Sequence, residues 1–284
     1  MISLTAGIFH SCQKKAFNSS SVDFTEEFVF TKGIEGPAVD SKGNLYAVNF
    51  SQEGTVGMVN KNGQSSLFAT LPKGSTGNGI RFDKEDNMYI ADYTGHNILR
   101  IQKGTSEAVV YATNPTMNQP NDLAIAPNGT LYASDPNWKE ETGNLWMVSN
   151  REFILLEKDM GTTNGIEVSP DGKKLYVNES IQRNIWVYDI DSEGRLSHKK
   201  LFKSFADFGM DGMRCDAKGN LYVCRYGKGT VVVLAPDGNV IGEVRLKGKK
   251  PTNITFGGKD GKQCFVTVAD RGCIETFSSA MYNR

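Results

Sequence analysis

Residues 78–91 read Asn-Gly-Ile-Arg-Phe-Asp-Lys-Glu-Asp-Asn-Met-Tyr-Ile-Ala. A polar residue opens the stretch, and a short apolar run follows it. A group rich in Asp and Asn then leads to a second apolar run that carries a tyrosine. Asp and Asn favour tight turns because their side chains bond to nearby backbone and tolerate left-handed conformations. The stretch therefore predicts two short strands joined by a turn.

The opening phrase of this stretch returns six times along the chain, at spacings of 43, 43, 43, 47 and 42 residues. Its first residues are Glu35, Asn78, Asn121, Asn164, Asp211 and Asn253. Each unit continues with a third strand-like run and a weaker fourth, as at 98–101 and 109–111. Four short strands in a repeat of this length are typical of a propeller blade. We predict an all-β, six-bladed β-propeller with four-stranded blades.

The two ends of the chain should close the ring. The last repeat has only three strand-like runs after Asn253, and the segment 24–30 precedes the first repeat. We expect this N-terminal strand to complete the last blade, because pairing removes an open sheet edge. The expected domains are a tail at 1–22, either signal-like or disordered, and a single propeller at 23–284.

Charge and hydropathy narrow the class of partner. The chain has 32 basic and 32 acidic residues and no basic stripe, which argues against nucleic acid. No run reaches the ~18–20 apolar residues that a transmembrane helix needs. We expect a monomer that acts on a small molecule.

The first residues leave the location open. An apolar run at 1–9 precedes Cys12 and resembles the end of a lipoprotein signal, but a basic start is missing. The protein is then either periplasmic and lipid-anchored at Cys12, or cytoplasmic. The other cysteines are not in metal-binding pairs, so free thiols are expected, and one disulfide is possible after export. They are Cys215, Cys224, Cys264 and Cys273.

The repeated polar residues also predict a site. Each opens the inner strand of its blade, so all six should meet at one mouth of the central channel. A single Asn-Gly pair is usually only a turn. Two carboxylates at a crowded mouth, however, repel each other unless a cation lies between them. Glu35 and Asp211 with the amide oxygens of Asn121 and Asn164 suit one Ca²⁺, although Mg²⁺, Mn²⁺ or Zn²⁺ remain alternatives.

Neighbouring loops should complete a substrate pocket. The loop 135–144 in the third blade is the longest of its kind and carries Trp138 as a wall or lid, with Tyr93 and His96 on the next loop. Asn78 and Asn253 stand at the same position of the repeat as the four ligands and are expected to bind substrate, water or backbone. For Trp138, Tyr93 and His96, the alternative is that each lies on an ordinary solvent-exposed loop without a role in the pocket.

The phrases 34–37, 119–123, 163–166, 210–213 and 251–253 together resemble the SMP-30/gluconolactonase/luciferin-regenerating family, which is related to diisopropyl fluorophosphatase. The likeness covers residues 25–284. It implies a propeller with a catalytic divalent cation, usually Ca²⁺, held by Glu35, Asn121, Asn164 and Asp211. It also implies that Asp122 is catalytic or close to the substrate.

The chain departs from that family at several positions. Sugar lactonases often carry Arg where this chain has Gln119, which we expect to contact substrate. Fluorophosphatase-like members carry His where this chain has Ala269, and hold a second ion with residues that are here Arg214 and Thr255. We therefore predict one bound ion, with Arg214 in the space of the second.

The resemblance implies a calcium-dependent hydrolase of the lactonase or esterase type that opens a sugar or aliphatic lactone. The ion would polarise the carbonyl, and Asp211 would act as base or nucleophile. Alternatives are a phosphotriesterase with the same site and a non-catalytic ligand-binding propeller.

Overall fold

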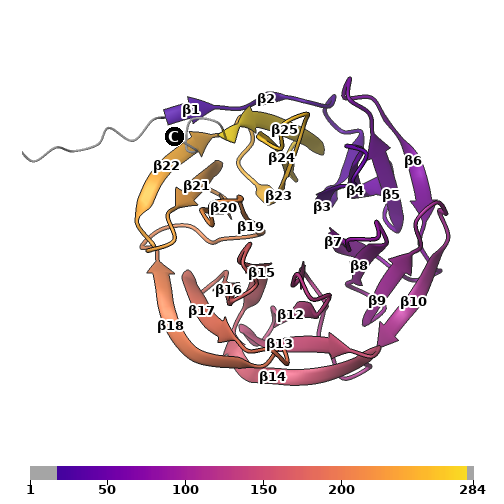
Figure 1. Cartoon of the computed structure of the whole chain (residues 1–284). Coiled ribbons are helices and arrows are strands. Elements are labelled where there is room, and N and C mark those ends of the chain that lie inside the picture. Colours follow the sequence, from indigo (N-terminus) through magenta and orange to yellow (C-terminus); the bar gives the residue numbers. More distant parts are fainter. Residues whose placement is uncertain (1–17, 280–284) are drawn as a thin grey trace, which may run out of the picture.

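The structure is a computed structural model that describes residues 18–279. Short strands form six sheets arranged around a central axis, and the described residues contain no α-helix (Figure 1). Each sheet runs from an inner strand at the axis to an outer strand at the rim. The prediction of an all-β, six-bladed propeller is confirmed.

The blades follow one another along the chain. The first three contain β3 (Phe30–Val39), β4 (Leu45–Phe50), β5 (Thr55–Val59) and β6 (Ser65–Thr70); β7 (Gly77–Phe82), β8 (Met88–Asp92), β9 (Asn97–Ile101) and β10 (Ala108–Thr113); and β11 (Leu123–Ile125), β12 (Leu131–Asn137), β13 (Thr142–Ser149) and β14 (Glu152–Gly161).

The other three contain β15 (Thr163–Val168), β16 (Lys174–Glu179), β17 (Asn184–Ile190) and β18 (Leu196–Ser204); β19 (Met213–Cys215), β20 (Leu221–Arg225), β21 (Thr230–Leu234) and β22 (Val240–Arg245); and β23 (Pro251–Gly257), β24 (Gln263–Val268) and β25 (Cys273–Ser278). Neighbouring strands within each of these blades are antiparallel.

The aromatic residue near the start of each second strand, a tyrosine in five blades and Phe265 in the last, packs neighbouring blades together. The ring of Tyr46 in the first blade lies 5.4 Å from that of Phe82 in the second. Tyr222 and Phe256 make the same contact between the fifth and sixth blades, at 5.0 Å. The recurring aromatic therefore supplies the apolar core between blades, where aromatic rings bury a large area.

The glycine that follows several of the repeated polar residues has a packing role. A Cβ atom on Gly79 would lie 2.4 Å from Oδ1 of Asp122, and one on Gly212 would lie 2.0 Å from Cγ of Asn253. Neither glycine has a positive φ. The inner strands of adjacent blades approach too closely for a side chain at these positions, so the Asn-Gly phrase reflects blade packing rather than turn geometry.

The N-terminal segment closes the ring, as expected, although not with the expected residues. Strand β2 (Val22–Asp23) pairs antiparallel with β25 and is the fourth strand of the last blade. Strand β1 (Asn18–Ser20) pairs parallel with β22 of the fifth blade. The segment 24–30, which we expected to be this strand, instead follows it and bonds to the start of β25 and to the turn before it through single backbone contacts such as Phe24 N to Ile274 O, 2.9 Å.

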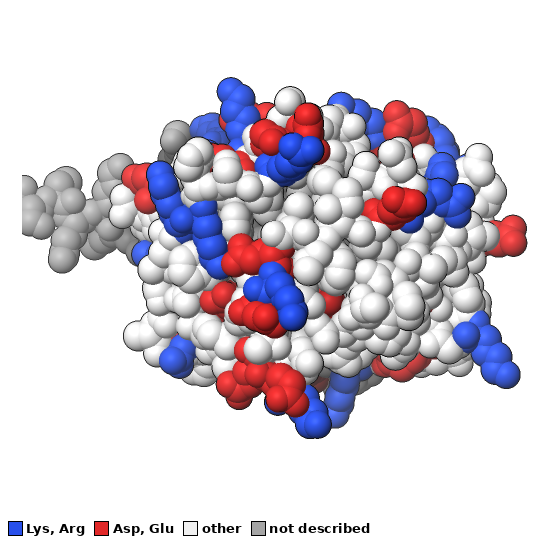
Figure 2. All heavy atoms as spheres, turned by 90° about the horizontal axis from the view of Figure 1, so that it is seen from below, with Lys and Arg blue, Asp and Glu red and all other residues white. Residues whose placement is uncertain are grey.

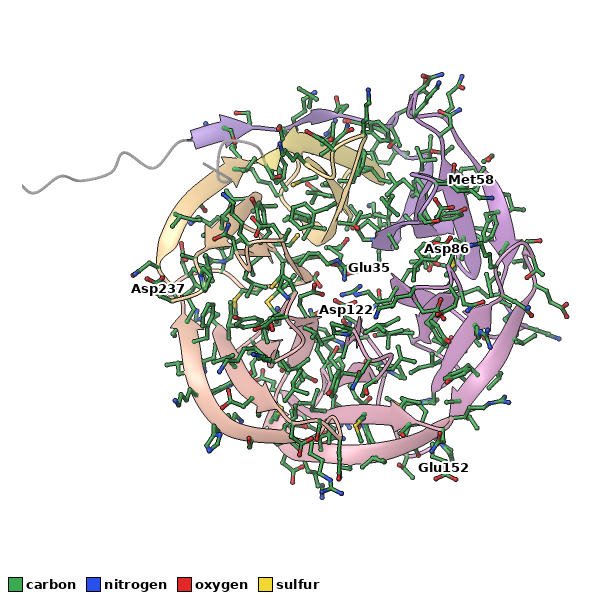
Figure 3. The ribbon with its side chains drawn as sticks, viewed as in Figure 1. Glu35, Met58, Asp86, Asp122, Glu152 and Asp237 are labelled. Carbon is green, nitrogen blue, oxygen red and sulfur yellow. The ribbon has the colours of Figure 1, made fainter. Side chains whose placement is uncertain are left out.

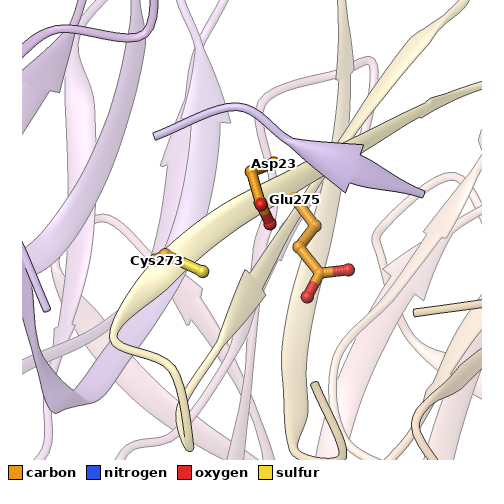
Figure 4. A group of neighbouring side chains, drawn as sticks. All are labelled: Asp23, Cys273 and Glu275. Atoms are coloured by element: carbon orange, nitrogen blue, oxygen red, sulfur yellow. The ribbon is translucent and has the colours of Figure 1, made fainter. Parts of the chain in front are cut away.

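This closure is reinforced by charges on the two ends of the chain. Asp23, Cys273 and Glu275 lie close together, with one potential ligand atom from each within 4.8 Å of the others (Figure 4). The guanidinium of Arg271 lies 2.6 Å from Asp23 and 2.7 Å from Glu275. Arginine already neutralises these carboxylates, so the cluster is an ion-paired seam between the first and last strands.

Pairing with the ring starts at Asn18, five residues before the expected boundary at residue 23. The predicted lipidation site Cys12 lies outside the described residues. No helix in the part of the chain that the structure describes is long and apolar enough to span a membrane. The four cysteines from Cys215 onward are free thiols. Basic and acidic side chains intermingle on the face shown in Figure 2.

Candidate active site

One mouth of the central channel holds a cavity of about 320 Å³ that the inner strands of all six blades help to line. Figure 3 shows Glu35 beside the axis of the ring, whereas Glu152 and Asp237 lie at the rim. The lining residues are Glu35, Asn78, Asn121, Trp138, Asn164, Ser180, Asp211, Tyr226 and Thr252. The structure thus brings together all four predicted metal ligands, with Asn78 and Trp138.

Two of the predicted ligands carry oxygen atoms that lack a protein partner. Asn121 Oδ1 and Asn164 Oδ1 are buried and accept no hydrogen bond from any residue that the structure describes. The amide of Asn164 donates to the carboxylate of Asp211, so its oxygen is the free end. A buried carbonyl oxygen without a donor is costly unless a cation or water satisfies it. The residues therefore fit a hard cation, which prefers carboxylate and amide oxygens.

The two carboxylates of this cavity are held in an unfavourable environment. Burial, with the nearby charge of Asp122, raises the pKa of Glu35 to about 8. Burial and the charge of Glu35 raise the pKa of Asp211 well above its usual range. Two acids that resist ionisation side by side become stable as carboxylates when a positive ion neutralises them. This electrostatic need is the second argument for a cation.

Asp122 and Asn253 lie just below the cavity rather than on its wall. Asp122 is 1% exposed and Asn253 is fully buried. The amide of Asn253 donates to Asp122 Oδ2 at 3.2 Å and also to Glu35. Asn253 was expected to contact substrate, water or backbone, and its side-chain oxygen does accept from a backbone group, Ile254 N, at 2.9 Å. Its amide group in addition holds the carboxylate of Asp122.

The opposite mouth of the channel contains a second cavity, of about 200 Å³, with a different chemistry. Arg81, Glu167 and Arg214 line it, together with Thr255. The guanidinium of Arg214 lies 3.4 Å from Glu167 and bonds to Pro37 O at 3.3 Å. Arg81 lies 3.7 Å from Glu167. Arg214 was expected in the channel, whereas Arg81 and Glu167 were not predicted.

The sequence did contain a signal for Arg81 and Glu167. Arg81, Glu167 and Arg214 each stand three positions after a repeated polar residue, on an inner strand that faces the channel. Charged residues at one phase of an inner strand are unusual unless they pair. Together with Glu35, Asp122 and Asp211, these side chains give four carboxylates against two guanidiniums, an excess of two negative charges that one divalent cation would neutralise.

The predicted substrate loop forms a side pocket. The expected loop 135–144 is mostly a hairpin, because Asp135, Pro136 and Asn137 pair with residues of β13, and only 138–141 connect the strands. Trp138 lies where β12 ends and separates the main cavity from a neighbouring one of about 410 Å³. Gln119 and Tyr93 line that side pocket. The His96 ring bonds to Met117 O at 2.8 Å and lines neither pocket.

Three further residues of the main cavity were not singled out in the sequence: Ser180, Tyr226 and Thr252. Ser180 and Tyr226 follow second strands, in the loops that return to this mouth, and Thr252 precedes Asn253 on β23. The position of these loops in the repeat was the available signal.

Six blades around an acidic, oxygen-lined mouth define a propeller with a centre suited to a cation. Residues 20–270 match the family described as the SMP-30/Gluconolactonase/LRE-like region, and the chain belongs to that family. The family resemblance seen in the sequence is confirmed.

Several known proteins are similar to the chain. A gluconolactonase of Zymomonas mobilis is 28% identical over 217 residues, which cover 68% of this chain and 60% of the relative. This chain thus spans about three fifths of that relative. A diisopropyl-fluorophosphatase of Loligo vulgaris is 25% identical over 290 residues, covering 88% and 92%. A solved structure of regucalcin from Agrobacterium tumefaciens, described as a calcium-binding protein, superposes with a TM-score of 0.78 at 23% identity, covering 92% and 93% of the chains, and shows the shared fold.

Proposed function

We propose that this protein is a hydrolase that opens a small lactone, with a divalent cation, Ca²⁺, at the acidic channel mouth. The observation that carries the proposal is the pair of unpartnered amide oxygens, Asn121 Oδ1 and Asn164 Oδ1, in one cavity with two carboxylates. Membership of the SMP-30/gluconolactonase family supports the reaction type. Relatives named gluconolactonase, 6-deoxy-6-sulfogluconolactonase and pentonolactonase support a lactone substrate.

Glu35, Asn121, Asn164 and Asp211 would hold the ion. When bound, such an ion supplies Lewis-acid polarisation of a carbonyl or phosphoryl oxygen. The net charge of the channel favours a single divalent ion, because Arg81 and Arg214 already neutralise two of its four carboxylates. A metal content of two ions per chain would contradict this stoichiometry.

The residues around the cavity would bind and orient the lactone. Asn78, Ser180 and Thr252 offer hydrogen-bonding groups on the wall, and Trp138 and Tyr226 offer aromatic surfaces at the opening. Gln119 would contact a part of the substrate that extends into the side pocket. Aromatic walls also exclude water from one side of the bound ring, which strengthens the polar contacts on the other side.

Asp211 would supply the reactive carboxylate in one of two roles. As a general base it takes a proton from the water that adds to the carbonyl carbon, and the ring C–O bond then breaks. As a nucleophile it forms an acyl-enzyme that water hydrolyses in a second step. The acyl-enzyme is a mixed anhydride. In a single turnover in ¹⁸O-water, unlabelled oxygen in the new carboxylate and ¹⁸O in Asp211 identify the nucleophile route with water attack at the carboxyl carbon of Asp211, because the general-base route always places ¹⁸O in the product.

Acid release from a panel of aldonolactones and aliphatic lactones tests the proposal, with and without EDTA. We expect the protein to hydrolyse lactones. EDTA should abolish this activity and added Ca²⁺ should restore it, and Asp211→Asn should lower its rate sharply. Full activity in chelator would reject the role of the cation. Mg²⁺, Mn²⁺ and Zn²⁺ in place of Ca²⁺ identify the preferred ion.

A second candidate is hydrolysis of phosphotriesters or fluorophosphates at the same site. The similarity to diisopropyl-fluorophosphatase supports it, because that match covers 88% of this chain. Ala269 stands where the sequence comparison led us to look for a histidine, and its methyl group offers no proton transfer. We therefore expect turnover of paraoxon-like substrates well below that of the best lactone. A protein inert toward every ester, but still binding Ca²⁺, would favour a non-catalytic propeller.

A further inference from the structure

Arg81 reaches from the second blade across the channel to the third and fourth blades. Its guanidinium contacts both oxygens of Asp122, Nη1 to Oδ1 at 3.0 Å and Nη2 to Oδ2 at 3.2 Å. It also donates to two backbone carbonyls, Ile80 O at 2.9 Å and Ile166 O at 3.2 Å. The two side chains are 8% and 2% exposed. This is a buried, bidentate ion pair with further hydrogen bonds, the geometry in which such a pair is strong.

Both oxygens of the Asp122 carboxylate are bound by protein donors, and the residue is 1% exposed. Leu123 N donates to Oδ1 at 2.9 Å, and Asn253 Nδ2 donates to Oδ2 at 3.2 Å. Arg81 Nη2 donates to Oδ2 at 3.2 Å, and Arg81 Nη1 lies 3.0 Å from Oδ1 as an ion-pair contact, so protein donors surround both oxygens of the carboxylate. A proton acceptor needs a free lone pair directed at the reacting group. In this arrangement the oxygens of Asp122 are directed at protein donors instead.

Further hydrogen bonds hold the backbone at Asn121 and Asp122. Asn121 N donates to Ser134 O at 2.9 Å, and Asn121 O accepts from Gly79 N at 2.9 Å. Asp122 N donates to Ser134 Oγ at 3.0 Å. Because the Asp122 side chain is anchored downward by Arg81, the adjacent Asn121 side chain is directed to the cavity with its oxygen unpartnered.

We propose that Arg81 and Asp122 form an internal ion pair that positions the amide oxygen of Asn121 at the metal centre, and that Asp122 acts as the counter-ion of Arg81 rather than as a proton acceptor. Arg81 is thus a positioning residue, and the pair works as a unit. The proposal rests on the proposed function for its metal centre and for its activity readout.

A double-mutant cycle tests the pair. The variants are Arg81→Met, Asp122→Asn and Arg81→Met/Asp122→Asn, with Arg100→Met as the control on the same blade outside the channel. Calcium affinity by calorimetry, thermal stability and lactone kinetics are measured for each. Removal of Arg81 leaves the charge of Asp122 buried without this partner, and removal of Asp122 leaves Arg81 with the longer 3.7 Å contact to Glu167, whereas removal of both leaves neither of these two charges behind.

We expect each single variant to weaken calcium binding and to lower kcat at saturating Ca²⁺ by at least about tenfold. The double variant should recover most of both losses, and Arg100→Met should match the wild type. If a single variant fails to fold, recovery of folding in the double variant demonstrates the same coupling.

Two results would overturn the proposal. One is additive losses in the double variant. The other is an Asp122→Asn enzyme with unchanged calcium affinity and no turnover, which the second substitution does not rescue. If the wild type binds Ca²⁺ but hydrolyses no lactone, the proposed function fails, and the calcium affinities alone decide this inference. A wild type that binds no Ca²⁺ would overturn both.

Discussion

Nη1 of Arg271 lies 2.6 Å from Oδ1 of Asp23, although the two residues are 248 positions apart in the chain. The same guanidinium contacts Glu275, which is fully buried, and Glu27. Arg271 therefore joins the first described strands to the last blade. The backbone pairing of β2 with β25 closes the ring, and this contact adds a charged link across the same junction.

Removal of this contact should destabilise the whole ring. We expect Arg271→Met to lower the free energy of unfolding by roughly 3 kcal/mol, because Glu275 loses its charged partner while it stays buried. Arg195→Met is the matched control, since Arg195 pairs with Glu193 on the surface, where such a pair contributes at most ~1 kcal/mol. Chemical denaturation measures both. Equal stability of the two variants would contradict a closing role for Arg271.

Calcium should stabilise the folded protein through the acidic mouth. A ligand that binds only the folded state raises the melting temperature by mass action. We expect Ca²⁺ to raise the melting temperature of the wild type, EDTA to reverse this, and Glu35→Gln to lose most of the increase. Glu53→Gln is the control, because Glu53 is exposed and lies outside the cavity, where it accepts a hydrogen bond from Thr31. A calcium-dependent increase that survives Glu35→Gln would place the ion elsewhere.

Trp138 should affect substrate binding without affecting the fold. Its side chain is 36% exposed and separates the main cavity from the side pocket. We expect Trp138→Ala to raise KM for the best lactone several-fold, while kcat and the melting temperature change little. Leu67→Ala, an exposed change on outer strand β6, is the control. A large fall in kcat would instead assign Trp138 to the reacting centre.

The sequence predicted the fold because every blade must meet the same physical requirements. Each blade needs the same turn residues, the same interblade aromatic and, in most blades, the same close glycine, so six weak local signals agree. Ring closure was predicted for the right part of the chain but shifted by several residues. The pairing of β2 with β25 depends on contacts between chain ends, which no local pattern encodes.

The sequence predicted those site residues whose chemical type alone marks them as ligands of a cation. Glu35 and Asp211 break the Asn phase of the repeat, and the structure brings them into one cavity with Asn121 and Asn164. Arg81 and Glu167 were missed because their partners come from other blades. The sequence shows that an inner-strand residue is charged. Which side chains it faces depends on how the blades are arranged in the closed ring.

Glu167 should make the stability of the fold depend on pH. Burial raises the pKa of Glu167 to about 7 from an ordinary value of 4.5, and the charge of Arg81 opposes this only in part. The folded protein therefore holds this proton more tightly than the unfolded chain does. The resulting stabilisation is fully present below pH 4.5 and is lost as the pH rises through 7.

Glu167→Gln isolates this contribution, because the amide does not titrate. Between pH 5 and pH 8 we expect the free energy of unfolding of the wild type to fall relative to that of the variant, by up to about 3 kcal/mol. Glu35 and Asp211 titrate in both proteins, so their contributions cancel when the two curves are subtracted. Urea denaturation at a series of pH values in EDTA gives the two curves. Parallel curves over this range would show that Glu167 stays ionised between its two arginines.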